Sequence, residues 1–255
     1  MNYKSIFNLI GILLGIFSLS FLPPMVLAFM YEESGIEVFL YSFIFFSILG
    51  GSIWATTRQQ NLPLNISDGF IITTLFWVVL ACVGSIPFYF FGLGISDAIF
   101  ESVSGITTTG ATTIVGLDNL PKSILLYRQL LQWIGGMGLI VLAVAVMPAL
   151  GIGGGQLYKM ELPGSHGNQK LTPKITDSAK ALWKIYVGLT LLCATLYFFS
   201  GMTLFDSIAH SLSTVAGGGF STHDDSIGFF NSALIETVCI IFMLLSAASF
   251  AVHYA

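Results

Sequence analysis

Long runs of apolar residues are the feature that most limits what this chain can fold into. Six of them lie at 6–31, 38–55, 69–91, 124–150, 182–199 and 231–252. Each approaches or exceeds the about 20 residues that an α-helix needs to cross the hydrocarbon core of a bilayer. Charged residues make up only 9% of the 255 positions, whereas a soluble protein would carry about 25%. The chain is therefore predicted to be an all-α membrane protein.

Basic residues divide unevenly between the two sides that alternating spans define. One side has Lys4, Arg58, Lys159, Lys170, Lys174, Lys180 and Lys184, and the other has Lys122 and Arg128. The positive-inside rule places the larger group, and with it the N-terminus, in the cytoplasm. The opposite side is acidic, which favours approaching cations, although ordinary solvated loop charges are an equal alternative. Pro23 and Pro24 interrupt the first run and predict a kink there.

Several other classes of protein are disfavoured. The cysteines, Cys82, Cys193 and Cys239, all lie inside apolar runs, where small packing residues are expected rather than a disulfide or zinc framework. The net charge of -4 is too small to indicate a nucleic-acid partner. The glycine-rich stretch at 151–156 lacks the Lys-Ser/Thr ending of a phosphate-binding loop. Because no nucleophile has a base at usable spacing, we expect no enzymatic activity.

Two stretches, 96–118 and 204–226, fit neither a spanning helix nor a simple loop. Each begins near an aspartate, Asp97 or Asp206, that is expected to cap a short helix. The first then reads SDAIFESVSGITTTGATTI and the second FDSIAHSLSTVAGGGFSTH, and neither apolar piece is long enough to cross a bilayer. A shift of 109 residues aligns them, the two aspartates included. An internal repeat is the simplest explanation.

The repeated unit is predicted to be a spanning helix, a half-helix with a Gly/Thr-rich return, and a second spanning helix. Non-helical backbone at membrane depth is tolerated only where protein buries it or where it lines a watery path. A run such as 107–110 can present successive carbonyl oxygens, which is how potassium-selective filters replace the water shell of an ion. Glycine allows the backbone angles that this requires, and positions 217–219 are all glycine. Ordinary turns are the alternative, but two framed copies favour a filter.

These motifs resemble those of a known family. The stretches ESVSGITTTGATTIVGLDNLP, YRQLLQWIGGMGLIVLAVAVMP and AHSLSTVAGGGFSTHDDSIGFF are similar to the TrkH/TrkG-type potassium-uptake subunits of bacteria, in the Trk/Ktr/HKT superfamily. The resemblance covers essentially the whole chain. It implies potassium uptake across the bacterial inner membrane, with K⁺ as the transported ion.

The family architecture is an extra helix pair followed by four repeats around one potassium-channel-like pore. The resemblance implies an N-terminal helix pair at 1–65, a first pore repeat at 66–150 with its filter loop at 107–111, a cytoplasmic connector at 151–178 and a second pore repeat at 179–255 with its filter loop at 216–220. The third and fourth repeats have no counterpart here. The chain is therefore expected to be the front half of such a subunit, as a fragment, as one of two chains or as a self-pairing half. Alone, it should not restore potassium uptake.

Alignment with the family's filter assigns ion contact to main-chain carbonyl groups. K⁺ is expected at the carbonyl oxygens of Thr108, Thr109, Gly217 and Gly218, with Gly110 and Gly219 permitting the geometry. 

Other polar residues of the two repeats have supporting roles in this interpretation. Glu101 and His210, at matching positions, are expected to hold the loops by hydrogen bonds, with a direct functional role as the alternative. Arg128 and Glu236 are expected at the outer interface, with pairing across repeats as the alternative. The run 223–225 is a weak candidate for a divalent-ion site and a better one for an acidic vestibule.

Partners follow from the resemblance. It implies a cytosolic nucleotide-binding regulatory subunit of TrkA type, a homodimer in the full-length family, and a lipid bilayer around both. The alternative function is a non-conducting assembly or regulatory membrane subunit.

Overall fold

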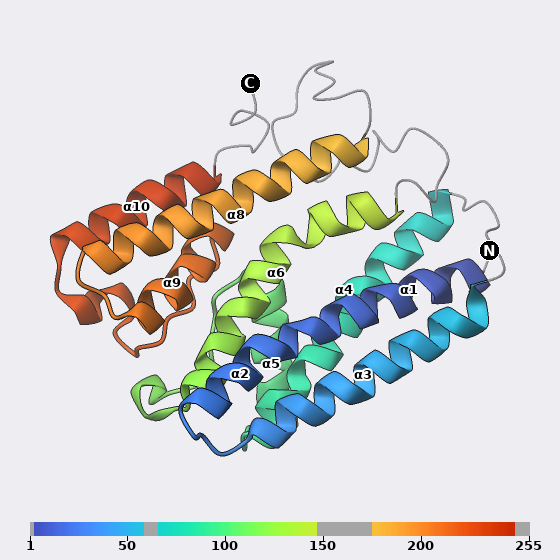
Figure 1. Ribbon diagram of the computed structural model, residues 1–255, viewed down its shortest axis with the longest axis horizontal. Helices are drawn as coiled ribbons and strands as arrows, with labels where there is room; N and C mark the ends of the chain where they lie inside the picture. The colour runs from blue at the N-terminus through green and yellow to red at the C-terminus, as the bar shows by residue number, and fades with distance from the viewer. Residues whose placement is uncertain (1–2, 59–65, 147–174, 248–255) are drawn as a thin grey trace.

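The described part of the protein is entirely helical. The computed structural model describes residues 3–58, 66–146 and 175–247. Its elements, with 3₁₀ helices labelled η, are α1 (Tyr3–Ser18), η1 (Leu19–Phe21), α2 (Leu22–Met30), α3 (Ile36–Thr57), α4 (Ile66–Phe90), α5 (Ile95–Ile106), η2 (Leu117–Asn119), α6 (Lys122–Val146), α8 (Ile175–Phe199), α9 (Leu204–Ala216), η3 (Ser226–Phe230) and α10 (Ala233–Ala247). The long helices run roughly along the longest axis of the molecule (Figure 1). The predicted all-α fold is confirmed.

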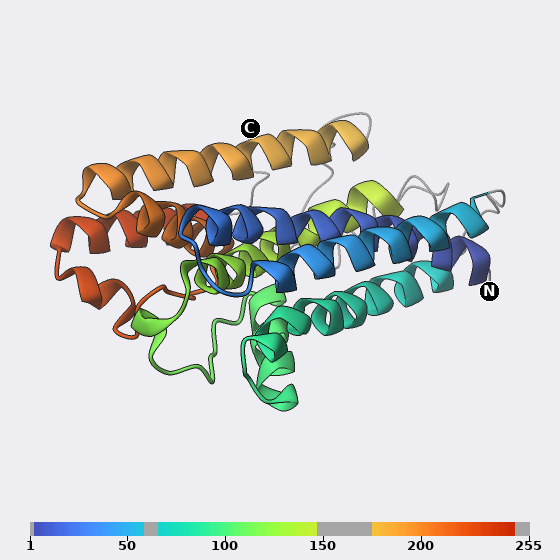
Figure 2. The same cartoon turned by 60° about the horizontal axis from the view of Figure 1, so that its bottom comes forward.

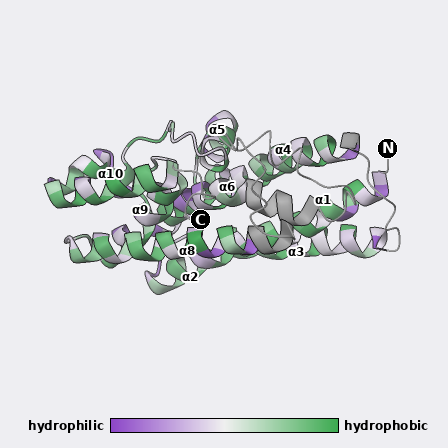
Figure 3. Ribbon diagram, turned by 90° about the horizontal axis from the view of Figure 1, so that it is seen from above, coloured by the Kyte–Doolittle hydropathy of each residue, from purple (hydrophilic) through white to green (hydrophobic). Residues whose placement is uncertain are grey.

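Four of the described helical stretches are long and apolar enough to cross a membrane. They are Tyr3–Met30, Ile36–Thr57, Asp68–Phe90 and Lys180–Phe199, and they correspond to the first, second, third and fifth expected spans. At 25 residues, α6 is as long as α4. The described part of the sixth span, α10, has 15 residues. Hydrophobic residues dominate the long helices in Figure 3.

The first helices, α1, η1 and α2, follow one another and pack along α3. The 3₁₀ helix η1 interrupts the α-helix here, and Pro23 and Pro24 lie in the first turn of α2. The kink predicted at these prolines stays a prediction. Proline is tolerated there because an N–H at the start of a helix has no helical partner. Glycine allows α1 and α3 to approach closely. A Cβ at Gly11 would lie 2.9 Å from the carbonyl oxygen of Gly50, and a Cβ at Gly50 would lie 2.7 Å from that of Gly11.

The remaining helices form two units with the same order of elements. In each unit a long helix leads into a half-helix, an irregular loop and another long helix (Figure 2). α8 begins and ends 109 residues after α4, and α9 begins 109 residues after α5. The start of α8 at Ile175 falls inside the range 151–178 expected for the connector, because hydropathy marks where apolar residues begin, whereas a helix can continue past them. The connector up to residue 174 lies outside the described residues.

α6 belongs to the first unit but contacts helices of both units. It packs against α4 and α5 of its own unit and against α8 and α9 of the other. Both half-helices end near its middle. A Cβ at Gly135 would collide with the carbonyl oxygen of Ile106, and a Cβ at Gly136 would lie 3.2 Å from the Cβ of Ala216. These small residues therefore let both half-helices pack closely against α6.

The contact between α1 and α3 predicts a position-specific effect on stability. Gly50→Val should lower the free energy of unfolding by about 1–3 kcal/mol, because overpacking would force the two helices apart. Gly51→Val is the matched control, since a Cβ at Gly51 meets nothing within 4 Å. Thermal unfolding of the detergent-purified chain measures both variants. Equal losses in the two would contradict this account of the packing.

Candidate functional site

Both half-helices end in the same hydrogen-bonded turn. At each helix end, one N–H bonds to a carbonyl three residues back, and the next N–H along the chain bonds to one five residues back, which defines a Schellman motif. The bonds are Thr108 to Gly105 and Thr109 to Ser104 in the first copy, and Gly217 to Thr214 and Gly218 to Ser213 in the second, all between 2.9 and 3.1 Å. In a trans peptide the C=O points away from the N–H. The carbonyls of Thr108 and Gly217 therefore point away from their half-helices.

In both loops, residues with a positive φ then alternate with a residue that lacks one. φ is +53° at Thr108 and +76° at Gly110, and it is +67° at Gly217 and +84° at Gly219. The first positive φ is the one that a Schellman turn usually gives to glycine, so the β-branched Thr108 is strained there. Within the described ranges, no hydrogen-bond donor reaches the carbonyl oxygens of 108–110 or 217–219. These carbonyls are available to another ligand.

The two loops lie against each other. A Cβ at Gly110 would collide with the carbonyl oxygen of Gly218 and would lie 3.5 Å from the Cα of Gly219. Thr109, Gly217 and Gly219 are exposed, whereas Gly218 is buried. The structure thus brings the two predicted sets of ion contacts together, each with an exposed side. Ion binding at these residues stays a prediction.

Glu101 anchors the first loop from within α5. Its side chain is completely buried. Oε1 accepts a hydrogen bond from the hydroxyl of Thr112 and another from the N–H of Thr113 at 2.7 Å. The expected role of Glu101 in holding the loop is therefore confirmed.

Arg128 contacts both loops from inside the protein, and its expected place at the outer interface stays a prediction. The side chain is completely buried. Nε donates to Oε2 of Glu101 at 3.3 Å, Nη2 donates to the hydroxyl of Thr112 at 3.0 Å, and Nη1 donates to the carbonyl oxygen of Ser221 at 3.1 Å. A buried charge is tolerated when it is paired and hydrogen-bonded. The sequence did not reveal the burial of Arg128, because its hydrogen-bond partners come from distant parts of the chain. Glu236, its counterpart in α10, is exposed.

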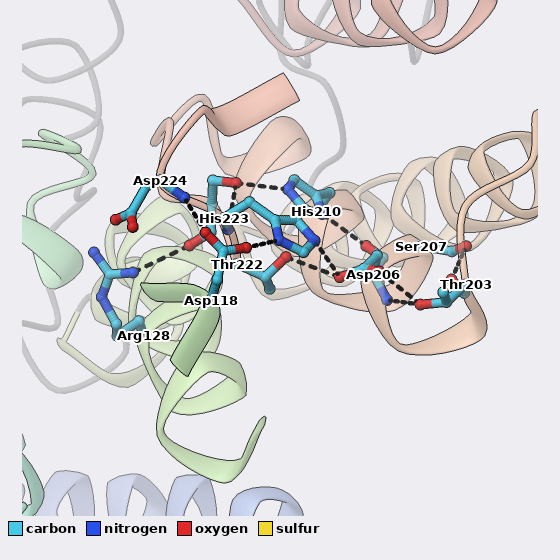
Figure 4. A network of polar contacts seen from close by, with 10 residues as sticks. Asp118, Arg128, Thr203, Asp206, Ser207, His210, Thr222, His223 and Asp224 are labelled. Carbon is cyan, nitrogen blue, oxygen red and sulfur yellow. Dashed lines mark hydrogen bonds and ion pairs between the residues drawn. The ribbon is translucent and has the colours of Figure 1, made fainter. Parts of the chain in front are cut away.

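Side chains of α9 hold the end of the second loop (Figure 4). His210 lies with Nδ1 2.9 Å from the main-chain oxygen of Asp206 and Nε2 2.9 Å from Oγ of Ser221. Because a carbonyl can only accept, Nδ1 carries a proton. The carboxylate of Asp206 accepts a hydrogen bond from the hydroxyl of Thr222 at 2.8 Å. The loop-holding role expected of His210 is confirmed, and Asp206 shares it.

The aspartates do not cap the half-helices as expected. Gly94 occupies the N-cap of α5 without a side-chain bond, and Thr203 caps α9 by accepting from the N–H of Asp206 at 3.1 Å. Asp97 and Asp206 lie in the first turns, where a negative charge interacts favourably with the helix dipole. The prediction was wrong because the residues before the aspartates take the cap position.

The segments that leave the two loops are bonded to each other. Oδ1 of Asp224 accepts from the N–H groups of Gly116 at 3.0 Å and Leu117 at 3.1 Å. Nδ1 of His223 lies 2.5 Å from Oδ1 of Asp118, and this hydrogen bond holds the pKa of Asp118 below its usual value. Figure 4 shows His223, Asp224 and Asp118 side by side. Across the described ranges, no group of three or more His, Cys, Asp or Glu side chains is placed to hold a metal ion.

Together, the helices and loops define an integral membrane protein of all-α type with two half-helix loops paired beside a shared long helix. A family model described as TrkH, cation transport protein, matches residues 35–255. The chain therefore belongs to the TrkH cation transport protein family.

Named relatives agree with this assignment. The Trk system potassium uptake protein TrkH of Vibrio parahaemolyticus is 49% identical over 258 residues, which cover 100% of this chain and 53% of that protein. The TrkG protein of Escherichia coli is 46% identical over 99% of this chain and 53% of its own length. The crystal structure of the potassium transporter TrkH from Vibrio parahaemolyticus matches with a TM-score of 0.85 at 46% identity, over 100% of this chain and 52% of that one. The chain spans about half the length of these relatives.

The sequence interpretation missed the polar face of α6. Arg128, Gln129 and Gln132 are all completely buried within an apolar run. Residues four apart share one face of a helix, so 128 and 132 could have been recognised as a pair facing the same neighbour. Which neighbour they face is visible only in the folded chain.

The strained Thr108 predicts opposite effects of two exchanges. Thr108→Gly should raise the free energy of unfolding by about 1 kcal/mol, because removing the Cβ relieves the left-handed conformation. Gly217→Thr, at the matching position, should lower it by about the same amount. Thermal unfolding of the purified chain measures both. A loss of stability in Thr108→Gly would contradict the strain.

The buried ion pair predicts non-additive losses. Arg128→Met should lower the free energy of unfolding by about 3–5 kcal/mol, because Glu101 would keep a buried, unpaired charge. The double variant Arg128→Met/Glu101→Gln should lose less, since no charge is left. Denaturant unfolding of both variants and of Glu101→Gln measures the difference. If the double variant loses at least as much as Arg128→Met alone, the pairing is wrong.

Proposed function

We propose that the chain forms part of a potassium uptake pathway across the bacterial inner membrane. Its two loops supply two sides of a carbonyl-lined filter. K⁺ binds the carbonyl oxygens of Thr108, Thr109, Gly217 and Gly218, and Gly110 and Gly219 allow the backbone angles. The observation that supports this most directly is that the two loops share one alternating backbone conformation and lie in contact. Carbonyl oxygens without other donors are suited to replacing the water of a cation.

The charge distribution supports a cation as the ligand. The C-terminal end of a helix carries a partial negative charge, and α5 and α9 both end at the loops. On the segments that follow, Asp118, Asp224 and Asp225 are exposed. An acidic approach raises the local concentration of cations. The same features would disfavour an anion at this place.

The proposed setting follows the relatives and the charge asymmetry. The relatives are named potassium uptake proteins, and each is about twice as long as the part matched here. The remaining sides of the filter therefore come from sequence equivalent to their second halves. The excess of basic residues on the N-terminal side of the spans favours a cytoplasmic N-terminus. A nucleotide-binding regulatory subunit of TrkA type acts from that side, on a complete transporter that is a homodimer.

The test is a chimera in which residues 1–255 replace the matching half of the Vibrio parahaemolyticus TrkH protein. In cells that lack their own potassium uptake systems, the chimera should support growth at limiting potassium and take up rubidium. Gly110→Asp should lower rubidium uptake at least about tenfold, because a side chain there collides with the second loop and strains a left-handed φ.

Gly228→Asp is the matched control, since a Cβ at Gly228 meets nothing within 4 Å. It adds the same charge outside the loops and should leave uptake unchanged. A chimera that is inserted in the membrane but takes up no rubidium would favour the alternative, a non-conducting assembly or regulatory subunit.

A further inference from the structure

The side chain of Gln132 forms hydrogen bonds on both sides of the glycines of the second loop. It lies one turn after Arg128 on α6, and its side chain is completely buried. Oε1 accepts a hydrogen bond from Oγ of Ser213 at 2.7 Å, in the last turn of α9. The same oxygen accepts from the N–H of Phe220 at 3.1 Å, directly after the glycines. One carboxamide therefore ties the start of the loop to its end.

Gly218 lies between these two hydrogen bonds, and the reason why it is glycine differs from that for Gly217 and Gly219. Gly217 and Gly219 have left-handed φ values of +67° and +84°, and a Cβ at either meets nothing within 4 Å. Gly218 has no such φ. The three atoms nearest to a Cβ built on Gly218 all belong to the Gln132 carboxamide, with Oε1 at 2.5 Å and Nε2 at 2.6 Å. The space that a side chain would need at 218 is filled by Gln132.

The first loop shows what happens where no such carboxamide is present. The position that matches Gly218 is Thr109, which carries a side chain and is exposed. The residue that matches Ser213 is Ser104, and its hydroxyl donates to the carbonyl oxygen of Ala111 in its own loop at 2.5 Å. Ser104 thus bonds within its own loop, whereas its counterpart Ser213 bonds to a side chain of α6.

We infer that Gln132 is a positioning residue for the second loop: its carboxamide sets where the backbone at 217–219 lies and is the reason why position 218 must be glycine. The carboxamide ends a flexible side chain, but complete burial and two hydrogen bonds keep it from moving aside. In so far as these carbonyls bind K⁺, the inference rests on the proposed function and makes Gln132 a determinant of ion preference.

The test compares Gly218→Ala in two backgrounds of the chimera described above. With Gln132 present, Gly218→Ala should lower rubidium uptake about tenfold and lower the thermal unfolding midpoint of the purified chimera. In the Gln132→Ala background the same exchange should change both quantities much less, because the obstructing atoms are gone. Gln132→Ala alone should reduce the preference for rubidium over sodium at least about threefold while the chimera still unfolds cooperatively.

Two controls separate a specific fit from a general loosening. Gln129→Ala removes the same atoms from another completely buried position of α6, and Gln129 is not among the atoms nearest to Gly218, so it should not rescue Gly218→Ala. Gly217→Ala is strained by its φ and should not be rescued by Gln132→Ala.

Four results would be decisive. Equal effects of Gly218→Ala in both backgrounds, or rescue by Gln129→Ala, would overturn the fit between Gln132 and Gly218. An unchanged ion preference in Gln132→Ala would overturn its positioning role. If the unmodified chimera takes up no rubidium, the proposed function fails, and the unfolding midpoints still decide whether Gln132 requires glycine at 218.

Discussion

Backbone that leaves a helix at membrane depth must bond to the rest of the protein or line a watery path, and the other features of the two loops depend on this constraint. Part of the need is met locally, since the first N–H groups of each loop bond back to the half-helix. The rest is met by buried side chains. Glu101, Arg128 and Gln132 each bond a main-chain atom of a loop. Within the described residues, no donor reaches the carbonyl oxygens of 108–110 and 217–219.

These bonds also make the position of each loop depend on the other repeat. Arg128 and Gln132 belong to the first repeat and bond the second loop, while Asp224 belongs to the second and bonds the segment after the first loop. A buried ion pair adds little net stability, because both charges lose their water. The contribution of the pair between Arg128 and Glu101 is to hold two irregular segments at a defined distance, which a shared ion would require.

The loops of the two repeats have the same pattern of backbone conformation but different side chains. Position 108 is threonine and position 217 is glycine, yet both have left-handed φ values. A common backbone with unlike side chains indicates that main-chain atoms are what the two copies share in function. The asymmetry between Thr109 and Gly218 has its origin outside the loops, in a side chain of α6. Repeat alignment therefore located the loops but could not explain each of their residues.

Hydropathy, prolines and the 109-residue offset by themselves determined the helical class, the interruption of the α-helix before α2, the half-helices and the places where backbone leaves the helix. They did so because apolar runs, missing N–H groups and glycine positions act through their immediate neighbours. Only the tertiary structure decided that Arg128 is buried against both loops, and that Gln132 faces Gly218. Their contacts with the second loop join residues 86 to 93 positions apart. They depend on how whole helices pack, a property that no local pattern encodes.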